Sequence, residues 1–239
     1  MKTLKDKPIG LIVAENLEAA QVFEAHGMDF CCHGRQTLEE ACRSGNVTVA
    51  QIEGELAKLS GSSNLELPDV HSMTLDELTR HIVSVHHSYT KKALLGIAAH
   101  LDTVVRVHGD NHSELNDIRK EFIPLKEELE QHLEKEEQIL FPYIDALAEA
   151  FRCKGQRPHA CFNEVAQPIA MMEHEHENAG RALDRIRVLA LDYQPPADAC
   201  NTYRLLLREL QELEQDLHVH IAKENYLLFP QAITLENNI

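Results

Sequence analysis

The fold is decided by the segment Leu129-Glu130-Gln131-His132-Leu133-Glu134-Lys135-Glu136, which leads to Leu140-Phe141-Pro142. The same order of residues returns as Leu217-His218-Val219-His220-Ile221-Ala222-Lys223-Glu224, which leads to Leu228-Phe229-Pro230. At this offset of 88 residues seven positions are identical, and His87 and His176 lie at a similar offset of 89. Each half of the repeat therefore carries one His followed, about 45 residues later, by His-x-x-x-Glu, as a duplicated helix pair would.

Around the repeat, apolar residues recur at three- and four-residue steps, which is the period of an amphipathic helix. One such segment opens with the capping-box pattern Thr74-Leu75-Asp76-Glu77, and three more run over roughly 114–141, 165–191 and 200–229. Short loops with Gly109, Gly155 and Pro195-Pro196 separate them. We therefore predict an all-α, up-down-up-down four-helix bundle. Pro124 is expected to kink the second helix or to mark its true start.

The residues before the bundle form a separate module. The run from Ser60 to Pro68 is rich in linker residues and lacks helical periodicity, so we predict a small helical N-terminal domain over residues 1–62 and the bundle over residues 70–239. Within the first domain a helix stopped by Gly27 and capping-box patterns at Thr37 and Thr48 indicate three or four short helices.

Composition excludes several classes of protein. Lys and Arg number 23 against 39 Asp and Glu, and the formal charge of −16 would repel nucleic acid and anionic membrane surfaces. No apolar run approaches the eighteen residues that a membrane span needs, and the N-terminus does not fit a secretory signal, so we expect a cytoplasmic protein. The six cysteines follow no disulfide framework. Cys42, Cys153, Cys161 and Cys200 have no ligand spacing and are interpreted as single thiols.

The paired His and Glu residues point to a metal. Residues four apart on a helix share one face, so His132 projects with Glu136 and His220 projects with Glu224. Leu129, Leu133 and Leu140 lie on the same face, which directs these polar groups into the bundle, where an unpaired carboxylate costs several kcal/mol. The alternative is that these His and Glu residues are solvated pairs on the surface, but the duplication of the pattern argues against this. We predict a dinuclear site of four imidazoles and two bridging carboxylates: His87, His132, Glu136, His176, His220 and Glu224. Iron, manganese and zinc all suit such ligands, and iron is favoured for its redox chemistry.

Four stretches together resemble one family: Met28-Asp29-Phe30-Cys31-Cys32-His33-Gly34, the run from His132 to Pro142, Met172-Glu173-His174-Glu175-His176-Glu177, and His220-Ile221-Ala222-Lys223-Glu224-Asn225. They are similar to the Repair of Iron Centres proteins, which are hemerythrin-like di-iron proteins of iron–sulfur cluster repair. The resemblance covers nearly the whole chain. It implies two non-haem irons per chain in a hemerythrin-like bundle, protection against nitric oxide and oxidative stress, and damaged iron–sulfur proteins as partners.

The resemblance assigns the four histidines above as ligands and Glu136 and Glu224 as bridges. His86 beside His87 leaves an ambiguity of register, and His87 is preferred because it follows His81 by six residues. His174 is expected to be solvated, and His108 to lie near the end of the first helix, as an outer-sphere or gate residue. His33 departs from the family pattern, in which glycine is common.

Cys31 and Cys32 are assigned a functional, catalytic role, because Gly27 and Gly34 bracket a loop that can present thiols to a partner. Two routes to repair remain open, iron donation and nitric oxide reduction, so whether the protein is an enzyme is undecided. Alternatives are a hemerythrin-like module that binds or senses oxygen, although such carriers use five histidines, and an iron store. A homodimer is left open.

Overall fold

The computed structural model describes residues 3–16, 18–31, 33–59 and 73–239. Most of these residues are helical, and the only β-type pairing among them is an isolated bridge between Pro8 and Thr37. The predicted all-α class is confirmed. The chain divides into two compact units: unit 1 comprises residues 1–79, 144–159 and 218–239, and unit 2 comprises residues 80–143 and 160–217. None of the described helices is long and apolar enough to cross a membrane.

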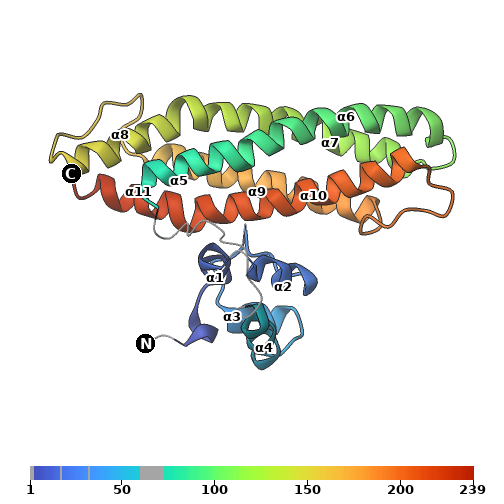
Figure 1. The fold of residues 1–239 in the computed structure, drawn as a ribbon, viewed down its shortest axis with the longest axis horizontal. Coiled ribbons are helices and arrows are strands. Elements are labelled where there is room, and N and C mark those ends of the chain that lie inside the picture. Colours follow the sequence, from blue (N-terminus) through green and yellow to red (C-terminus); the bar gives the residue numbers. More distant parts are fainter. Residues whose placement is uncertain (1–2, 17, 32, 60–72) are drawn as a thin grey trace. The chain divides into compact units, whose positions relative to one another are not determined.

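Unit 2 is built from four long helices that lie side by side in Figure 1: α6 (Ser88–His108), α7 (Glu114–Lys135), α9 (Ala166–Leu189) and α10 (Asn201–Lys223) as far as residue 217. Each helix buries one apolar stripe. On α6, for example, Leu94, Ile97 and Leu101 are fully buried at three- and four-residue steps in a core shared by all four helices. The predicted four-helix bundle is confirmed.

Helix α7 runs through Pro124 without interruption. The expectation that Pro124 marks the true start of this helix was therefore wrong, since α7 begins at Glu114. Apolar burial on both sides of the proline explains this, because Phe122 and Leu125 are both packed in the core of unit 2.

Three π-helical turns interrupt the long helices. They are η2 (Val83–His87), between α5 (Leu75–Ile82) and α6; η3 (Glu136–Leu140), between α7 and α8 (Phe141–Arg152); and η4 (Glu224–Leu228), between α10 and α11 (Phe229–Glu236). The turns η3 and η4 occupy matching positions of the sequence repeat, and Phe-Pro follows each of them. The proline has no N–H to donate to the carbonyl four residues earlier, so regular α-helical bonding is broken there in any case.

Unit 1 contains a short 3₁₀ turn, η1 (Leu4–Asp6), and four short helices: α1 (Ile9–Glu15), α2 (Ala19–Ala25), α3 (Leu38–Ser44) and α4 (Val49–Leu59). The capping box of Thr37 and Glu40 is present, and Gly27 ends α2 with a φ of +63°. Residues Phe23, Phe30 and Ile52 lie in a core that also holds Ile221 and Ala222 of α10. The four short helices thus share a core with the end of α10. The predicted linker, Ser60 to Pro68, lies outside the described residues.

Candidate metal centre

Four of the predicted ligands meet inside unit 2. His87 ends η2, His132 lies on α7, Glu136 begins η3 and His176 lies on α9. All four are at most 3% exposed. One carboxylate oxygen of Glu136, Oε2, lies 3.4 Å from Nε2 of His87 and 3.4 Å from Nε2 of His132. The Nε2 atoms of His132 and His176 face each other at 3.1 Å. The carboxylate is therefore placed between two imidazoles from different helices.

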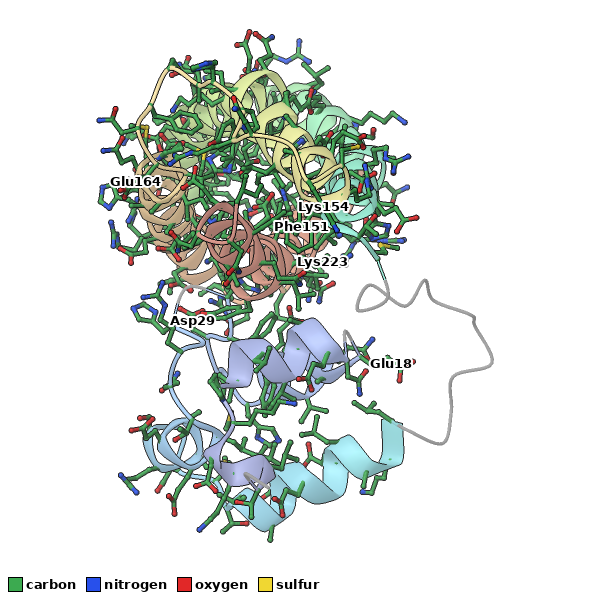
Figure 2. The ribbon with its side chains drawn as sticks, turned by 90° about the vertical axis from the view of Figure 1, so that its left-hand side faces the viewer. Glu18, Asp29, Phe151, Lys154, Glu164 and Lys223 are labelled. Atoms are coloured by element: carbon green, nitrogen blue, oxygen red, sulfur yellow. The ribbon has the colours of Figure 1, made fainter. Side chains whose placement is uncertain are left out.

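The other two predicted ligands lie in unit 1, at the end of α10 and the start of η4. His220 and Glu224 are at most 1% exposed, and Nε2 of His220 lies 2.9 Å from Oε1 of Glu224. This pair repeats the four-residue spacing of His132 and Glu136. Between them, Lys223, labelled in Figure 2, is only 2% exposed.

Two groups of these side chains have the make-up of a metal site, with potential ligand atoms that all lie within 4.8 Å of one another. One group is His87, Glu136, His220 and Glu224, and the other is His132, Glu136, His176 and Glu224. Both carboxylates belong to both groups.

The Glu136 carboxylate tests whether a cation suits this place. It is 0% exposed, and neither of its oxygens has a hydrogen-bond partner among the described residues. An isolated buried carboxylate is strongly disfavoured unless a positive charge compensates it. The donor set, imidazole nitrogens with carboxylate oxygens, is one that iron, manganese and zinc accept. The residues therefore fit a bound metal.

Two further carboxylates orient the histidines. Nδ1 of His87 lies 2.8 Å from Glu137, and Nδ1 of His132 lies 2.9 Å from Glu175. Lys91 and Lys135 donate hydrogen bonds to the same two carboxylates, Glu137 and Glu175 respectively. The hydrogen bond with His132 is the main reason why the pKa of Glu175 falls to about 2, which keeps this carboxylate charged. A carboxylate that fixes the second nitrogen of a histidine is the usual support of a metal ligand.

Sequence reasoning missed Glu137 and Glu175. Each directly follows or precedes a predicted ligand, Glu136 or His176, and such a neighbour lies about 100° around the helix, toward an adjacent helix. This adjacency to a predicted ligand was the feature of the sequence that could have identified Glu137 and Glu175. Which acidic neighbour reaches a histidine depends on the packing of the helices.

Four other histidines that the sequence singled out lie in different surroundings. His86 is buried, but its Nδ1 lies 2.9 Å from Asp216. His87, and not His86, joins the groups of potential ligands. His174 is exposed, and so is His33, whose ring lies 2.5 Å from Asp29. His108 is the last residue of α6, about 31 Å from the start of that helix at 1.5 Å per residue, so it does not serve the cluster around Glu136.

Cys31 is held tightly in unit 1, and Cys32 lies outside the described residues. Cys31 is 3% exposed, and both its backbone N–H and its thiol donate to Oδ1 of Asp29. Its carbonyl accepts hydrogen bonds from Nδ2 of Asn225 and the hydroxyl of Tyr226, each at 3.2 Å. The loop expected to present thiols to a partner therefore keeps this thiol covered.

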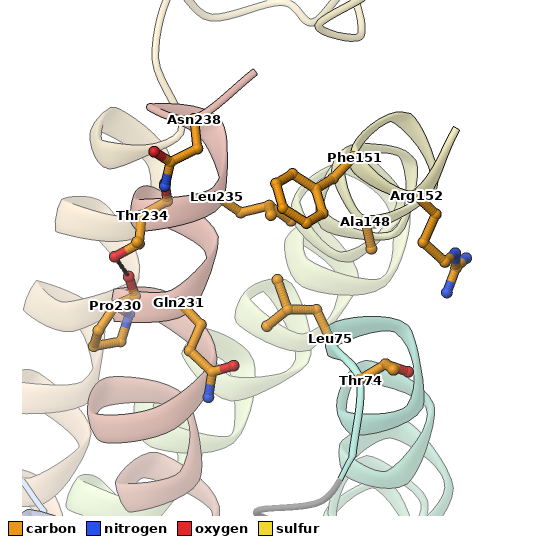
Figure 3. A pocket seen from close by; sticks show the side chains of 10 residues that line it. All are labelled: Thr74, Leu75, Ala148, Phe151, Arg152, Pro230, Gln231, Thr234, Leu235 and Asn238. Carbon is orange, nitrogen blue, oxygen red and sulfur yellow. Dashed lines mark hydrogen bonds between the residues drawn. The ribbon is translucent and has the colours of Figure 1, made fainter. Parts of the chain in front are cut away.

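A separate cavity of about 530 Å³ opens in unit 1 between α5, α8 and α11 (Figure 3). Its walls are mainly apolar and include Leu75, Ala148, Phe151 and Leu235, with Arg152 at its edge. None of the predicted metal ligands lines it.

Two family models match the chain. A domain of unknown function, ScdA_N, matches residues 5–60, and the hemerythrin HHE cation-binding domain matches residues 78–232, which include all six predicted ligands. The chain belongs to the hemerythrin HHE family.

Three similar proteins are each named "Iron-sulfur cluster repair protein YtfE". Those of Edwardsiella ictaluri and Enterobacter sp. are 35% identical over 235 residues, 97% of this chain and 98% and 99% of theirs. That of Musicola paradisiaca is 33% identical over 229 residues, 96% of this chain and 97% of its own. The predicted family is confirmed.

Proposed function

We propose that this protein repairs iron–sulfur clusters damaged by nitric oxide or oxidative stress, and that it does so with a dinuclear non-haem iron centre. The observation that carries the proposal is the fully buried Glu136 carboxylate, which lies between His87 and His132 and has no hydrogen bond among the described residues. The relatives named for cluster repair match over nearly the full chain, which supports the same function.

In this proposal each metal takes two imidazoles, and Glu136 and Glu224 bridge the pair. His87 and His220 serve one ion, and His132 and His176 serve the other, in keeping with the two groups of neighbouring ligand atoms. Glu137 and Glu175 accept from the second nitrogens of His87 and His132, so they hold these rings in the tautomer with the proton on Nδ1, in which the lone pair of Nε2 can bind a metal.

Two irons held by six residues would retain open positions for a small ligand such as nitric oxide or oxygen and would supply electrons. The protein residues fix the ligand geometry and exclude bulk water, because all six are buried. Iron donation and nitric oxide reduction both remain compatible with this arrangement. The clients would be damaged iron–sulfur proteins.

Cys31 and Cys32 would act in transfer to the client and not in resting iron binding. The two proposed roles are assigned to the two domains predicted from the sequence, a cysteine-bearing one over residues 1–62 and a metal-binding one over residues 70–239. The two family models, which match residues 5–60 and 78–232, support this assignment. The described cysteines form no disulfide, which suits a reducing compartment such as the cytoplasm.

Metal analysis of the purified protein, together with repair of an iron–sulfur enzyme inactivated by nitric oxide, tests the proposal. We expect two irons per chain and recovery of the inactivated enzyme. Replacing both Cys31 and Cys32 by Ser should leave the iron and its optical spectrum intact and reduce the repair. Zinc alone, or one metal per chain, would contradict the di-iron centre. Release of nitrous oxide from the reduced protein on addition of nitric oxide would identify the reductase route.

A further inference from the structure

A second group of metal-binding side chains lies at the opposite end of α6, within unit 2. His108 ends α6, and His112 follows in the turn before α7. Asp198 and Cys200 stand just ahead of α10. Nε2 of His108 lies 3.2 Å from Sγ of Cys200, and Nε2 of His112 lies 3.2 Å from both carboxylate oxygens of Asp198. Each imidazole thus faces an anionic or ionisable donor on the other segment.

Each of these two distances is close to that between two ligands of one ion, although no three of these four described residues have ligand atoms that all lie within 4.8 Å of one another. Two ligands of a tetrahedral zinc ion, with Zn–S of about 2.3 Å and Zn–N of about 2.1 Å, lie about 3.5 Å apart. The two pairs are neighbours, since the ring centroids of His108 and His112 are 6.2 Å apart and both rings contact Tyr203 at 5.5 and 5.6 Å. Binding of one ion by all four residues therefore requires a rearrangement of side chains, and the Asp198 side chain, which would have to turn, is 62% exposed.

The ring of His112 is oriented by a carboxylate, as metal-binding histidines usually are. Nδ1 of His112 lies 2.8 Å from Glu114, which leaves Nε2 directed at Asp198. Glu137 and Glu175 hold His87 and His132 in the same way. The Glu114 carboxylate is also 3.5 Å from the Tyr203 hydroxyl, and Tyr203 is buried in the core of unit 2.

We infer that His108, His112, Asp198 and Cys200 bind one divalent transition-metal ion of the zinc class, in a mononuclear site with two nitrogens, one oxygen and one sulfur. Thiolate and imidazole ligands together select zinc-like ions over magnesium and calcium. On binding, the Cys200 thiol and any protonated imidazole lose their protons to solvent. The site is independent of the proposed dinuclear centre and uses none of its residues.

Cobalt(II) is a suitable probe, because a cobalt–thiolate bond gives a charge-transfer band, whereas the six residues proposed for the dinuclear centre contain no sulfur. We expect titration of the full-length, iron-loaded protein with Co²⁺ to produce this band with one equivalent bound. Cys200→Ser should abolish the band, and His108→Ala should weaken binding at least tenfold. Cys153→Ser, which changes an exposed thiol elsewhere, is the matched control and should leave the band intact.

Two more variants make the test decisive. Glu114→Ala should weaken Co²⁺ binding about 10- to 100-fold through loss of the support for His112. Glu136→Gln, which alters only the dinuclear centre, should leave the band unchanged, so that a failure of one site is distinguished from a failure of the other. Absence of the band from the wild-type protein, or its persistence in Cys200→Ser, would overturn the inference.

Discussion

The ring of Tyr226 occupies the space that any side chain at position 10 would need. A Cβ atom on Gly10 would lie 2.3 Å from the ring, well inside van der Waals contact. Tyr226 is two residues beyond Glu224 on η4, and Gly10 lies in α1. The contact therefore connects the first helix of the chain to the turn that begins with a proposed metal ligand.

A double-mutant cycle tests this contact. Gly10→Ala should destabilise the protein by about 1–3 kcal/mol, because it overpacks a buried site. In the background of Tyr226→Ala the same substitution should cost much less, which gives a coupling energy well above zero in chemical denaturation. Gly54, which has no atom within 4 Å of a built Cβ, offers the control Gly54→Ala. Equal costs of Gly10→Ala in both backgrounds would contradict the packing described.

The Glu136 carboxylate should destabilise the metal-free protein and should be needed for stabilisation by metal. Metal-free Glu136→Gln should be at least as stable as the metal-free wild type, because it removes a buried charge. Metal at about a thousand times its dissociation constant should raise the unfolding free energy of the wild type by about 4 kcal/mol, and that of the variant by less than half as much. Thermal denaturation with and without metal measures both effects. The exposed Glu134→Gln should behave as the wild type.

Glu175 should control metal affinity without binding the metal itself. Glu175→Ala removes the acceptor that orients His132, so metal affinity should fall about 10- to 100-fold while the helix content is retained. Competition with a chelator of known affinity measures the change. Glu177→Ala, at an exposed position on the same helix, should have no effect. Equal affinities in the two variants would remove Glu175 from the support of the centre.

Asp76 should make a pH-dependent contribution to stability. Burial opposes the shift, but hydrogen bonds with Thr74 and Arg152 outweigh it and hold the pKa of Asp76 below its ordinary value of 3.8. Because the folded-state pKa is the lower one, the stabilisation is present above the unfolded pKa and is lost as the pH falls through the folded pKa. The stability difference between metal-free wild type and Asp76→Asn should therefore shrink below about pH 4. A difference that is constant from neutral to acid pH would contradict this.

Local periodicity was sufficient for much of the fold, since the helices and the His-x-x-x-Glu faces depend on residues only four apart. The π turns could not be predicted, because the apolar pattern around Glu136 and Glu224 fits an ordinary helix nearly as well. Two of the partners of Cys31, Asn225 and Tyr226 on η4, lie more than 190 residues away along the chain and could not be predicted from local sequence. Cys200 looked like a single thiol for the same reason, since His108 is 92 residues distant in sequence.

The length of helix α6 separates the two proposed metal sites. It runs without a break from the residue after His87 to His108, and its 21 residues span about 31 Å. An ion held at one end cannot pass directly to ligands at the other, because no side chain bridges that length. Metal ions bound at the two ends of α6 would therefore exchange with the surrounding solution independently, each at its own rate.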